Sequence, residues 1–178
     1  MKINLNQNKI KLNKNNKDTP AVTNLPYRPN VGAMIFNHKG QIFVGLRHDL
    51  AKEGIWSFPQ GGIDKGENPE QALYRELQEE LGCNQFTILD EYPEWLSYDL
   101  PPHLIGKSFG GKYRGQTQKW FAVRFSGKDE DIRFDMQKEQ EFDDWKWIAL
   151  SELSNLKTGF KHDLYEKLAK YFASYAVS

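Results

Sequence analysis

Alternating and clustered apolar positions divide most of the chain into short strands. Apolar residues dominate 31–36 and 41–47, and the turn sequence between them, His38-Lys39-Gly40, predicts a hairpin. Residues 117–125 alternate, with Trp120 and Ala122 on one face and aromatic or branched residues on the other. Shorter apolar runs predict further strands at 56–58, 86–91, 94–100 and 142–148.

Two segments have helical spacing instead. Asn68 and Pro69 are typical of an N-cap and a first helical position, and Gly82 of a C-terminal stop, so they predict a helix over 69–81. Apolar residues three to four positions apart predict a second helix over 162–175. Strands combined with covering helices indicate an α/β layered fold.

The first 24 residues differ from the rest in composition. They are rich in Asn and Lys with few apolar residues, which predicts a disordered tail over residues 1–24 and one domain over 25–178. The chain has no apolar run long enough for a membrane helix and no signal-peptide pattern. We therefore expect a soluble cytoplasmic protein that does not contact a membrane, and nothing in the sequence predicts a stable protein partner.

The predicted helix over 69–81 carries an unusual group of carboxylates. Glu76, Glu79 and Glu80 stand three and four residues apart, on neighbouring positions of one helical face. Like charges at this spacing repel one another, and a hard divalent cation such as Mg²⁺ or Mn²⁺ would remove the repulsion. The alternative is that these glutamates form an ordinary solvated acidic face.

Charge elsewhere is balanced overall but unevenly distributed. The chain has 24 acidic and 24 basic residues, yet no Asp or Glu lies between residues 100 and 128, where six Lys and Arg residues fall. An acidic metal site beside a basic segment suits a substrate that carries phosphates. The basic side chains could equally line solvated strand edges.

The glutamates belong to a longer pattern. Gly61 is followed after five residues by Glu67, after seven more by Arg75-Glu76-Leu77, then by Glu79-Glu80 and Gly82. This pattern resembles the signature of the Nudix hydrolases with every fixed position matched. The resemblance implies an α/β/α sandwich with a mixed sheet, and it implies Glu76, Glu79 and Glu80 as ligands of Mg²⁺ or Mn²⁺, with more than one ion when substrate is bound.

Other signature residues are expected to hold the site together. A bidentate ion pair between Arg75 and Glu67 would fix the loop against the helix. We expect Gly61, Gly62 and Gly66 to form a tightly wound loop, and Gly61 to let this loop pass close to the helix. The predicted catalytic set is Glu67, Arg75, Glu79 and Glu141. Glu79 is the candidate general base inside the signature and Glu141 the candidate outside it, although Glu141 could instead belong to a solvated acidic loop.

Outside the signature, the resemblance narrows to one subgroup. Segments that carry it include 27–32, 56–62, 115–121 and 141–147. They are similar to the bacterial RNA pyrophosphohydrolases and to the dinucleoside polyphosphate hydrolases. This likeness implies Glu141 as an additional metal ligand and Phe160 as an aromatic that stacks on a nucleobase, with core packing as the alternative for Phe160. Arg28, Tyr98 and Lys119 are further candidates for contacts with phosphate or nucleotide.

Three functions follow as hypotheses. The first is removal of pyrophosphate from 5′-triphosphorylated RNA. The second is asymmetric hydrolysis of diadenosine tetraphosphate to ATP and AMP. The third is a non-catalytic nucleotide-binding module, which the full set of signature carboxylates disfavours. The expected partner is therefore a nucleotide or the 5′ end of an RNA.

Overall fold

The computed structural model describes residues 24–134 and 139–177. The predicted disordered tail lies, apart from Asn24, outside the described residues, and the domain boundary at residue 25 stays a prediction. Across the described part of the chain, no helix combines the length and the apolar character needed to cross a membrane.

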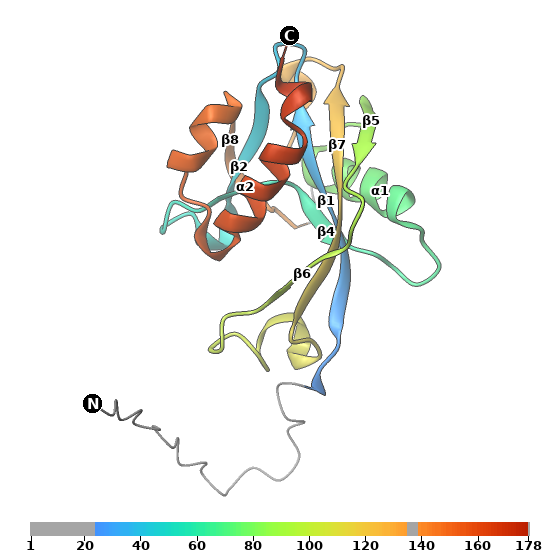
Figure 1. The fold of residues 1–178 in the computed structure, drawn as a ribbon, viewed down its shortest axis with the longest axis vertical. Helices are drawn as coiled ribbons and strands as arrows, with labels where there is room; N and C mark the ends of the chain where they lie inside the picture. Colours follow the sequence, from blue (N-terminus) through green and yellow to red (C-terminus); the bar gives the residue numbers. More distant parts are fainter. Residues whose placement is uncertain (1–23, 135–138, 178) are drawn as a thin grey trace, which may run out of the picture.

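One mixed sheet of eight strands runs through the centre of the molecule (Figure 1). The strands are β1 (Tyr27–Phe36), β2 (Ile42–Arg47), β3 (Trp56–Ser57), β4 (Gln60–Gly62), β5 (Phe86–Glu91), β6 (Leu96–Asp99), β7 (Gly115–Phe125) and β8 (Phe142–Ile148). Five strands lie side by side in the order β3-β2-β1-β7-β5. The other three pair with members of this row, β4 with β1, β6 with β7 and β8 with β2. The pair β1 and β7 is parallel along the whole of β1, and the other pairs are antiparallel.

Strands β1 and β7 begin earlier than the sequence pattern predicts. β1 starts at Tyr27 rather than at residue 31, and β7 starts at Gly115 rather than at 117. These first residues pair with each other in parallel, and β7 also receives β6 there. Polar residues can belong to a strand here because the neighbouring strands form hydrogen bonds with their backbone groups. The local pattern of polar and apolar residues does not reveal this pairing.

Helix α1 (Pro69–Leu81) lies on one face of the sheet and begins and ends as predicted. The Asn68 side chain accepts a hydrogen bond from the backbone of Gln71, whose side chain in turn accepts one from the backbone of Asn68. Gly82 closes the helix in the left-handed conformation with φ of 70°. Leu73, Leu77 and other apolar residues of α1 pack against the sheet in the first core.

Helix α2 (His162–Tyr171) covers the opposite face. Its residues Tyr165 and Leu168 pack with Trp120 and Ala122 of β7 in the second core. α2 is shorter than predicted, because the chain continues after Tyr171 as a 3₁₀ helix that keeps a similar apolar spacing. The molecule is thus an α/β/α sandwich with a mixed sheet, as the sequence predicts.

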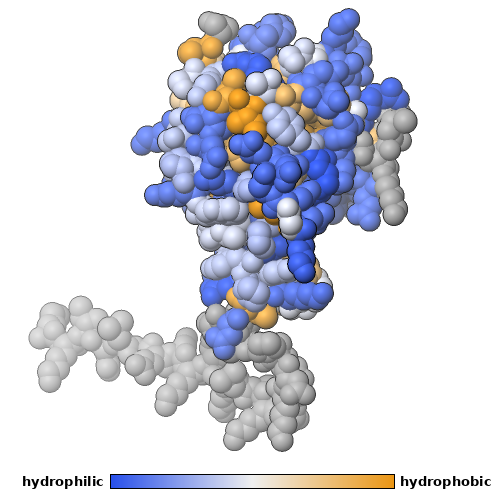
Figure 2. Space-filling model, turned by 90° about the vertical axis from the view of Figure 1, so that its right-hand side faces the viewer, coloured by the Kyte–Doolittle hydropathy of each residue, from blue (hydrophilic) through white to orange (hydrophobic). Residues whose placement is uncertain are grey.

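The remaining helical segments are single 3₁₀ turns or short 3₁₀ helices. They are η2 (His48–Leu50), η3 (Ser108–Gly111), η4 (Asp129–Asp131), η5 (Leu150–Asn155), η6 (Gly159–Lys161) and η7 (Ala173–Ala176). η3 lies in a projection built from residues 27–30 and 96–118, which we call the arm. Figure 1 shows the arm extending from the sandwich along β1, β6 and β7, and Figure 2 shows it narrower than the main body.

Two of the three glycines in the predicted wound loop, Gly61 and Gly62, do not form such a loop. Gly61 and Gly62 are extended residues of β4 and pair with Val31 and Asn30 of β1. Of the three glycines before α1, only Gly66 has a positive φ, 93°. Gly61 and Gly62 are needed for close approach instead, because a Cβ on Gly61 would lie 1.8 Å from Cδ of Glu76.

The first core predicts the effect of a cavity under α1. Leu77 is 1% exposed, so Leu77→Ala should lower the free energy of unfolding by about 2–5 kcal/mol, through lost burial and an unfilled cavity. Urea denaturation measures this loss. Tyr74→Ala, on the exposed side of the same helix, is the control and should change stability by only about 0.5 kcal/mol. Equal losses in the two variants would contradict this packing.

Candidate active site

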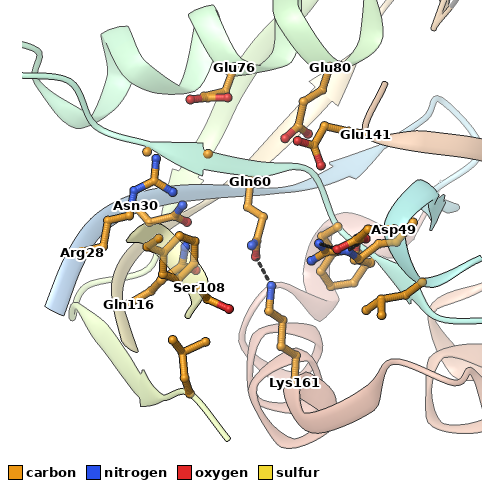
Figure 3. A pocket seen from close by; sticks show the side chains of 18 of the residues that line it. Arg28, Asn30, Asp49, Gln60, Glu76, Glu80, Ser108, Gln116, Glu141 and Lys161 are labelled. Carbon is orange, nitrogen blue, oxygen red and sulfur yellow. Dashed lines mark hydrogen bonds and ion pairs between the residues drawn. The ribbon is translucent and has the colours of Figure 1, made fainter. Parts of the chain in front are cut away.

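A cavity of about 830 Å³ opens where α1, β4, the arm, η6 and the segment before β8 meet. One wall is acidic and the opposite side carries cationic and aromatic side chains (Figure 3). The acidic residues that line it are Asp49, Glu76, Glu79, Glu80, Glu139 and Glu141. The cavity therefore joins the signature helix to residues from distant parts of the sequence.

Arg75 organises the signature carboxylates. Its Nε and Nη2 donate to the two oxygens of Glu67 at 2.7 and 2.8 Å, which is the bidentate pair that the sequence predicts. Nη1 also donates to Glu76 at 2.8 Å and to Glu79 at 3.2 Å, and Nη2 donates to the carbonyl oxygen of Gly62 at 2.8 Å. One guanidinium thus ties β4, the loop before α1 and two residues of α1 together.

The Arg75 contact changes the electrostatics of its partners. Hydrogen bonding to Arg75 is the largest cause that lowers the pKa of Glu67, to about 2. Burial has the opposite effect on Glu76 and raises its pKa, although Arg75 partly offsets this shift. The side chain of Glu79 is 59% exposed. Among the carboxylates that pair with Arg75, only Asp64 is more exposed.

Glu80 is the buried member of the acidic wall. It is 6% exposed, and its Oε2 atom is buried without a hydrogen-bond partner in the described part of the chain. Burial, then the charges of Glu141 and Glu76, raise the pKa of Glu80 well above its ordinary value. Figure 3 shows the carboxylates of Glu80 and Glu141 pointing toward one another, with Glu76 one turn earlier on α1.

This arrangement fits a divalent cation. A buried carboxylate oxygen without a partner is costly, and a second carboxylate beside it adds repulsion. Oxygen-ligated cations such as Mg²⁺ relieve both costs. Within residues 24–134 and 139–177 no three Asp, Glu, His or Cys side chains are grouped as a ready ligand set, and Glu76 and Glu79 form ion pairs with Arg75.

The side facing the carboxylates contains cationic and amide side chains. Lys161 is 6% exposed, and its Nζ donates to Oε1 of Gln60 at 2.7 Å, the contact dashed in Figure 3. Burial is the main cause that lowers the pKa of Lys161 to about 7. Gln118 connects Gln60 to Asn30 through its amide nitrogen, at 3.2 and 2.7 Å.

Aromatic rings and a second cation complete the cavity. Phe160 is 53% exposed, and its ring centroid lies 5.4 Å from that of Tyr98, whose pKa burial raises. Arg28 and Phe109 face the cavity from the arm. The exposure of Phe160 disfavours the alternative that it is an ordinary core residue.

The structure brings most predicted site residues together. Arg28, Tyr98, Phe160 and the predicted carboxylates of α1, with Glu141, line the cavity, while Glu67 lies behind Arg75. Lys119 is the exception. It was predicted to contact substrate, but it does not line the cavity. It is 7% exposed, forms an ion pair with Glu91 and donates to the carbonyl of Pro93. Side chains alternate along a strand, so Gln116 of β7 faces the cavity and Lys119 does not.

Sequence reasoning missed several cavity residues. Lys161, Gln60, Asn30 and Phe109 line the cavity, but no role there was predicted for them, although Asn30 and Gln60 lie in the segments 27–32 and 56–62 that carry the family resemblance. For Lys161, its position directly after Phe160 was the one available signal. The others reach the cavity only because β1, β4 and the arm come together in the fold.

Comparison with known proteins places these observations in context. Residues 26–171 match the model of the NUDIX domain. An RNA pyrophosphohydrolase from Gluconacetobacter diazotrophicus is 52% identical over 158 residues, covering 85% of this chain and 95% of that protein. A second, from Gluconobacter oxydans, is 50% identical over 150 residues, covering 84% and 88%.

A solved structure supports the fold. The Ap4A hydrolase of C. elegans, determined as a binary complex, superposes with a TM-score of 0.58 at 21% identity. The match covers 83% of this chain and 98% of the solved one. At this identity the likeness bears on the architecture alone.

The Glu67–Arg75 pair predicts a pH-dependent loss of stability. Because the pKa of Glu67 falls from 4.5 to about 2 on folding, the stabilisation by its charge is present above pH 4.5 and is lost as the pH falls toward 2. Glu67→Gln should therefore lower the thermal midpoint at neutral pH, and the difference from the parent should narrow below pH 4.5.

Thermal melts across this pH range measure the effect. Glu94→Gln is the matched control, since Glu94 is exposed and makes no ion pair in the described part of the chain. A difference for Glu67→Gln that stays constant with pH would contradict the role of its charge.

Proposed function

Because this chain belongs to the Nudix hydrolase family, we propose that it hydrolyses a nucleoside-linked polyphosphate, removing pyrophosphate from the triphosphorylated 5′ end of RNA. One observation carries this assignment. Two curated proteins named RNA pyrophosphohydrolase are 50% or more identical to this chain over most of both lengths. The acidic wall of the cavity, opposite cationic and aromatic side chains, is chemically suited to such a substrate.

The reaction requires attack by water on a phosphorus atom of the triphosphate. A bond forms between the water oxygen and that phosphorus, while the bridging bond between the α and β phosphates breaks. The water loses a proton to a base, and the products are 5′-monophosphorylated RNA and pyrophosphate. The protein must therefore stabilise the negative charge of the phosphates, orient the triphosphate and accept a proton from the water.

Divalent metal ions serve the Nudix hydrolases, and we assign their site to Glu76, Glu79, Glu80 and Glu141. Mg²⁺ or Mn²⁺, with more than one ion when substrate is present, suits these oxygen ligands. When bound, such ions neutralise phosphate charge and make a water molecule more acidic. The unpartnered oxygen of Glu80 supports this assignment more directly than the position of Glu79, which faces Arg75.

Two carboxylates are candidates for the proton acceptor. Glu79 lines the cavity, but its carboxylate already accepts a hydrogen bond from Arg75. Glu141 lines the same cavity beside Glu80 and makes no side-chain ion pair in the described residues. These contacts favour Glu141, and Glu79 remains the alternative.

The opposite side of the cavity is suited to the nucleotide. Phe160 is exposed beside Tyr98 and presents a face on which a base can stack, a contact worth about 1–3 kcal/mol. Arg28 offers a planar fork to phosphate oxygens. Lys161 adds a second cation, because a neighbouring phosphate would raise its pKa above the value of about 7 set by burial. An RNA substrate also suits a cytoplasmic protein.

A direct assay separates the hypotheses. Purified protein receives 5′-triphosphorylated RNA and diadenosine tetraphosphate at matched concentrations with Mg²⁺, and the products are resolved. We expect pyrophosphate and monophosphorylated RNA as the main products. ATP and AMP formed at the higher rate would favour the dinucleoside polyphosphate hydrolase, and retained nucleotide without any product would favour a binding module.

Glu80→Gln predicts opposite changes in turnover and in metal-free stability. Removing the buried charge should reduce RNA turnover by roughly 10² or more, since a metal ligand is lost. It should also raise the thermal midpoint in EDTA. Folding raises the pKa of Glu80, so the folded state loses stability as the pH rises and the buried carboxyl group must lose its proton. Glutamine carries no charge and avoids this loss at neutral pH.

The same variant tests the metal assignment without activity. Mg²⁺ should raise the thermal midpoint of the parent and of Glu94→Gln, but should have little effect on Glu80→Gln. Equal stabilisation of all three proteins by Mg²⁺ would mean that Glu80 is not a ligand.

A further inference from the structure

Phe109 has an unusual backbone for a bulky residue. Its φ and ψ are 54° and 36°, and it is the one non-glycine residue with a positive φ in the described part of the chain. Gly110 and Gly111 continue in the left-handed region, with φ of 65° and 72°. Glycine adopts this conformation freely, whereas a side chain at position 109 makes it costly. Such strain persists where the surrounding structure holds it in place, often at ligand-binding sites.

The strained backbone directs the Phe109 ring to Arg28. The guanidinium carbon of Arg28 lies over this ring, 5.1 Å from its centroid, and both residues line the cavity. A guanidinium stacked on an aromatic face is attracted by the ring and loses rotational freedom. The contact therefore favours the orientation in which the Arg28 guanidinium lies over the ring.

The main chain of β4 bounds Arg28 as well. A Cβ on Gly62 would lie 2.3 Å from Nη2 of Arg28, so the guanidinium occupies space that only glycine leaves open. Arg28 is close enough to Glu76 for its charge to oppose the rise in the pKa of that carboxyl. Figure 3 shows Arg28 on the other side of β4 from Glu76.

Among the described residues, no polar partner of Arg28 accounts for this placement. In residues 24–134 and 139–177, no side chain or backbone oxygen accepts a hydrogen bond from it, and it forms no ion pair. By contrast, Arg114, at the base of the same arm, donates to both carboxylate oxygens of Asp99. The N–H groups of Arg28 thus stay available to an oxyanion in the cavity.

We propose that Phe109 is a positioning residue for substrate, whose strained backbone holds its ring where it aims the guanidinium of Arg28 at the polyphosphate chain. This inference rests on the proposed function, because it assigns Arg28 a phosphate. Phe109 itself touches Arg28 and acts through it. The arm is therefore a part of the binding site that fixes an arginine in advance of substrate.

Steady-state kinetics on 5′-triphosphorylated RNA test the proposal. Phe109→Gly removes the ring and relieves the backbone, so KM should rise about threefold to tenfold with kcat nearly unchanged. Phe109→Trp preserves the aromatic face and should restore KM. Trp95→Ala, an exposed aromatic outside the cavity, is the matched control and should leave both constants unchanged.

A double-mutant cycle then asks whether Phe109 acts through Arg28. Arg28→Ala should raise KM further than Phe109→Gly, and the double variant should be no worse than Arg28→Ala alone. Independent, multiplying effects on KM would overturn the proposal, as would an unchanged KM in Phe109→Gly.

Thermal melts exclude a merely structural role. Phe109→Gly should melt at or above the midpoint of Phe109→Ala, because glycine alone relieves the strain. A rise in KM accompanied by a lower midpoint in Phe109→Gly than in Phe109→Ala would overturn the proposal.

Calorimetry with inorganic tripolyphosphate in Mg²⁺ separates this inference from the proposed function. If the parent protein cleaves no RNA but binds tripolyphosphate, and Phe109→Gly weakens that binding threefold or more, the proposed function fails and the positioning role stands. Undiminished tripolyphosphate binding by Phe109→Gly overturns the positioning role whatever the RNA assay shows.

Discussion

Repulsion between carboxylates on one helical face is the constraint on which the site depends. Arg75 supplies the counter-charge, bridging Glu67, Glu76 and Glu79 and also binding the carbonyl oxygen of Gly62. A lysine could not make these contacts together, since it lacks the planar fork that reaches several acceptors at fixed angles. The same guanidinium therefore stabilises the acidic helix and fixes β4 against it.

Arg75 leaves Glu80 unneutralised, and this asymmetry gives the cavity its chemistry. Glu76 and Glu79 have a fixed cationic partner, whereas Glu80 is buried beside Glu141 with an oxygen that lacks one. A cation bound at the proposed site would gain most from Glu80 and Glu141 and would compete with Arg75 for Glu76 and Glu79. Local contacts thus divide the four carboxylates into two pairs. Glu76 and Glu79 have a cationic partner in Arg75, whereas Glu80 and Glu141 have no such partner in the described residues.

The sequence predicted features that depend on local rules and missed those that depend on long-range pairing. The bounds of α1 follow from Asn68, Pro69 and Gly82, and the Arg75–Glu67 pair was expected from opposite charges at two positions of the Nudix signature. Lys119 was misplaced because its charge and its position in a basic segment do not reveal which face of β7 it occupies. Phe109 was overlooked because a left-handed backbone at a bulky residue is a tertiary property, held by contacts that no local pattern encodes.

Strand β4 explains why its glycines matter even though they are extended. Glu76 approaches Gly61 and Arg28 approaches Gly62, so a side chain at either position would collide with one of them. Two neighbouring residues of one short strand thereby admit an acidic group and a guanidinium to the same cavity. Strand β4 contacts α1, which carries the carboxylates, and also pairs with β1, which carries Arg28. Close approach at β4, rather than backbone flexibility, is therefore what brings the acidic wall and Arg28 to the same cavity.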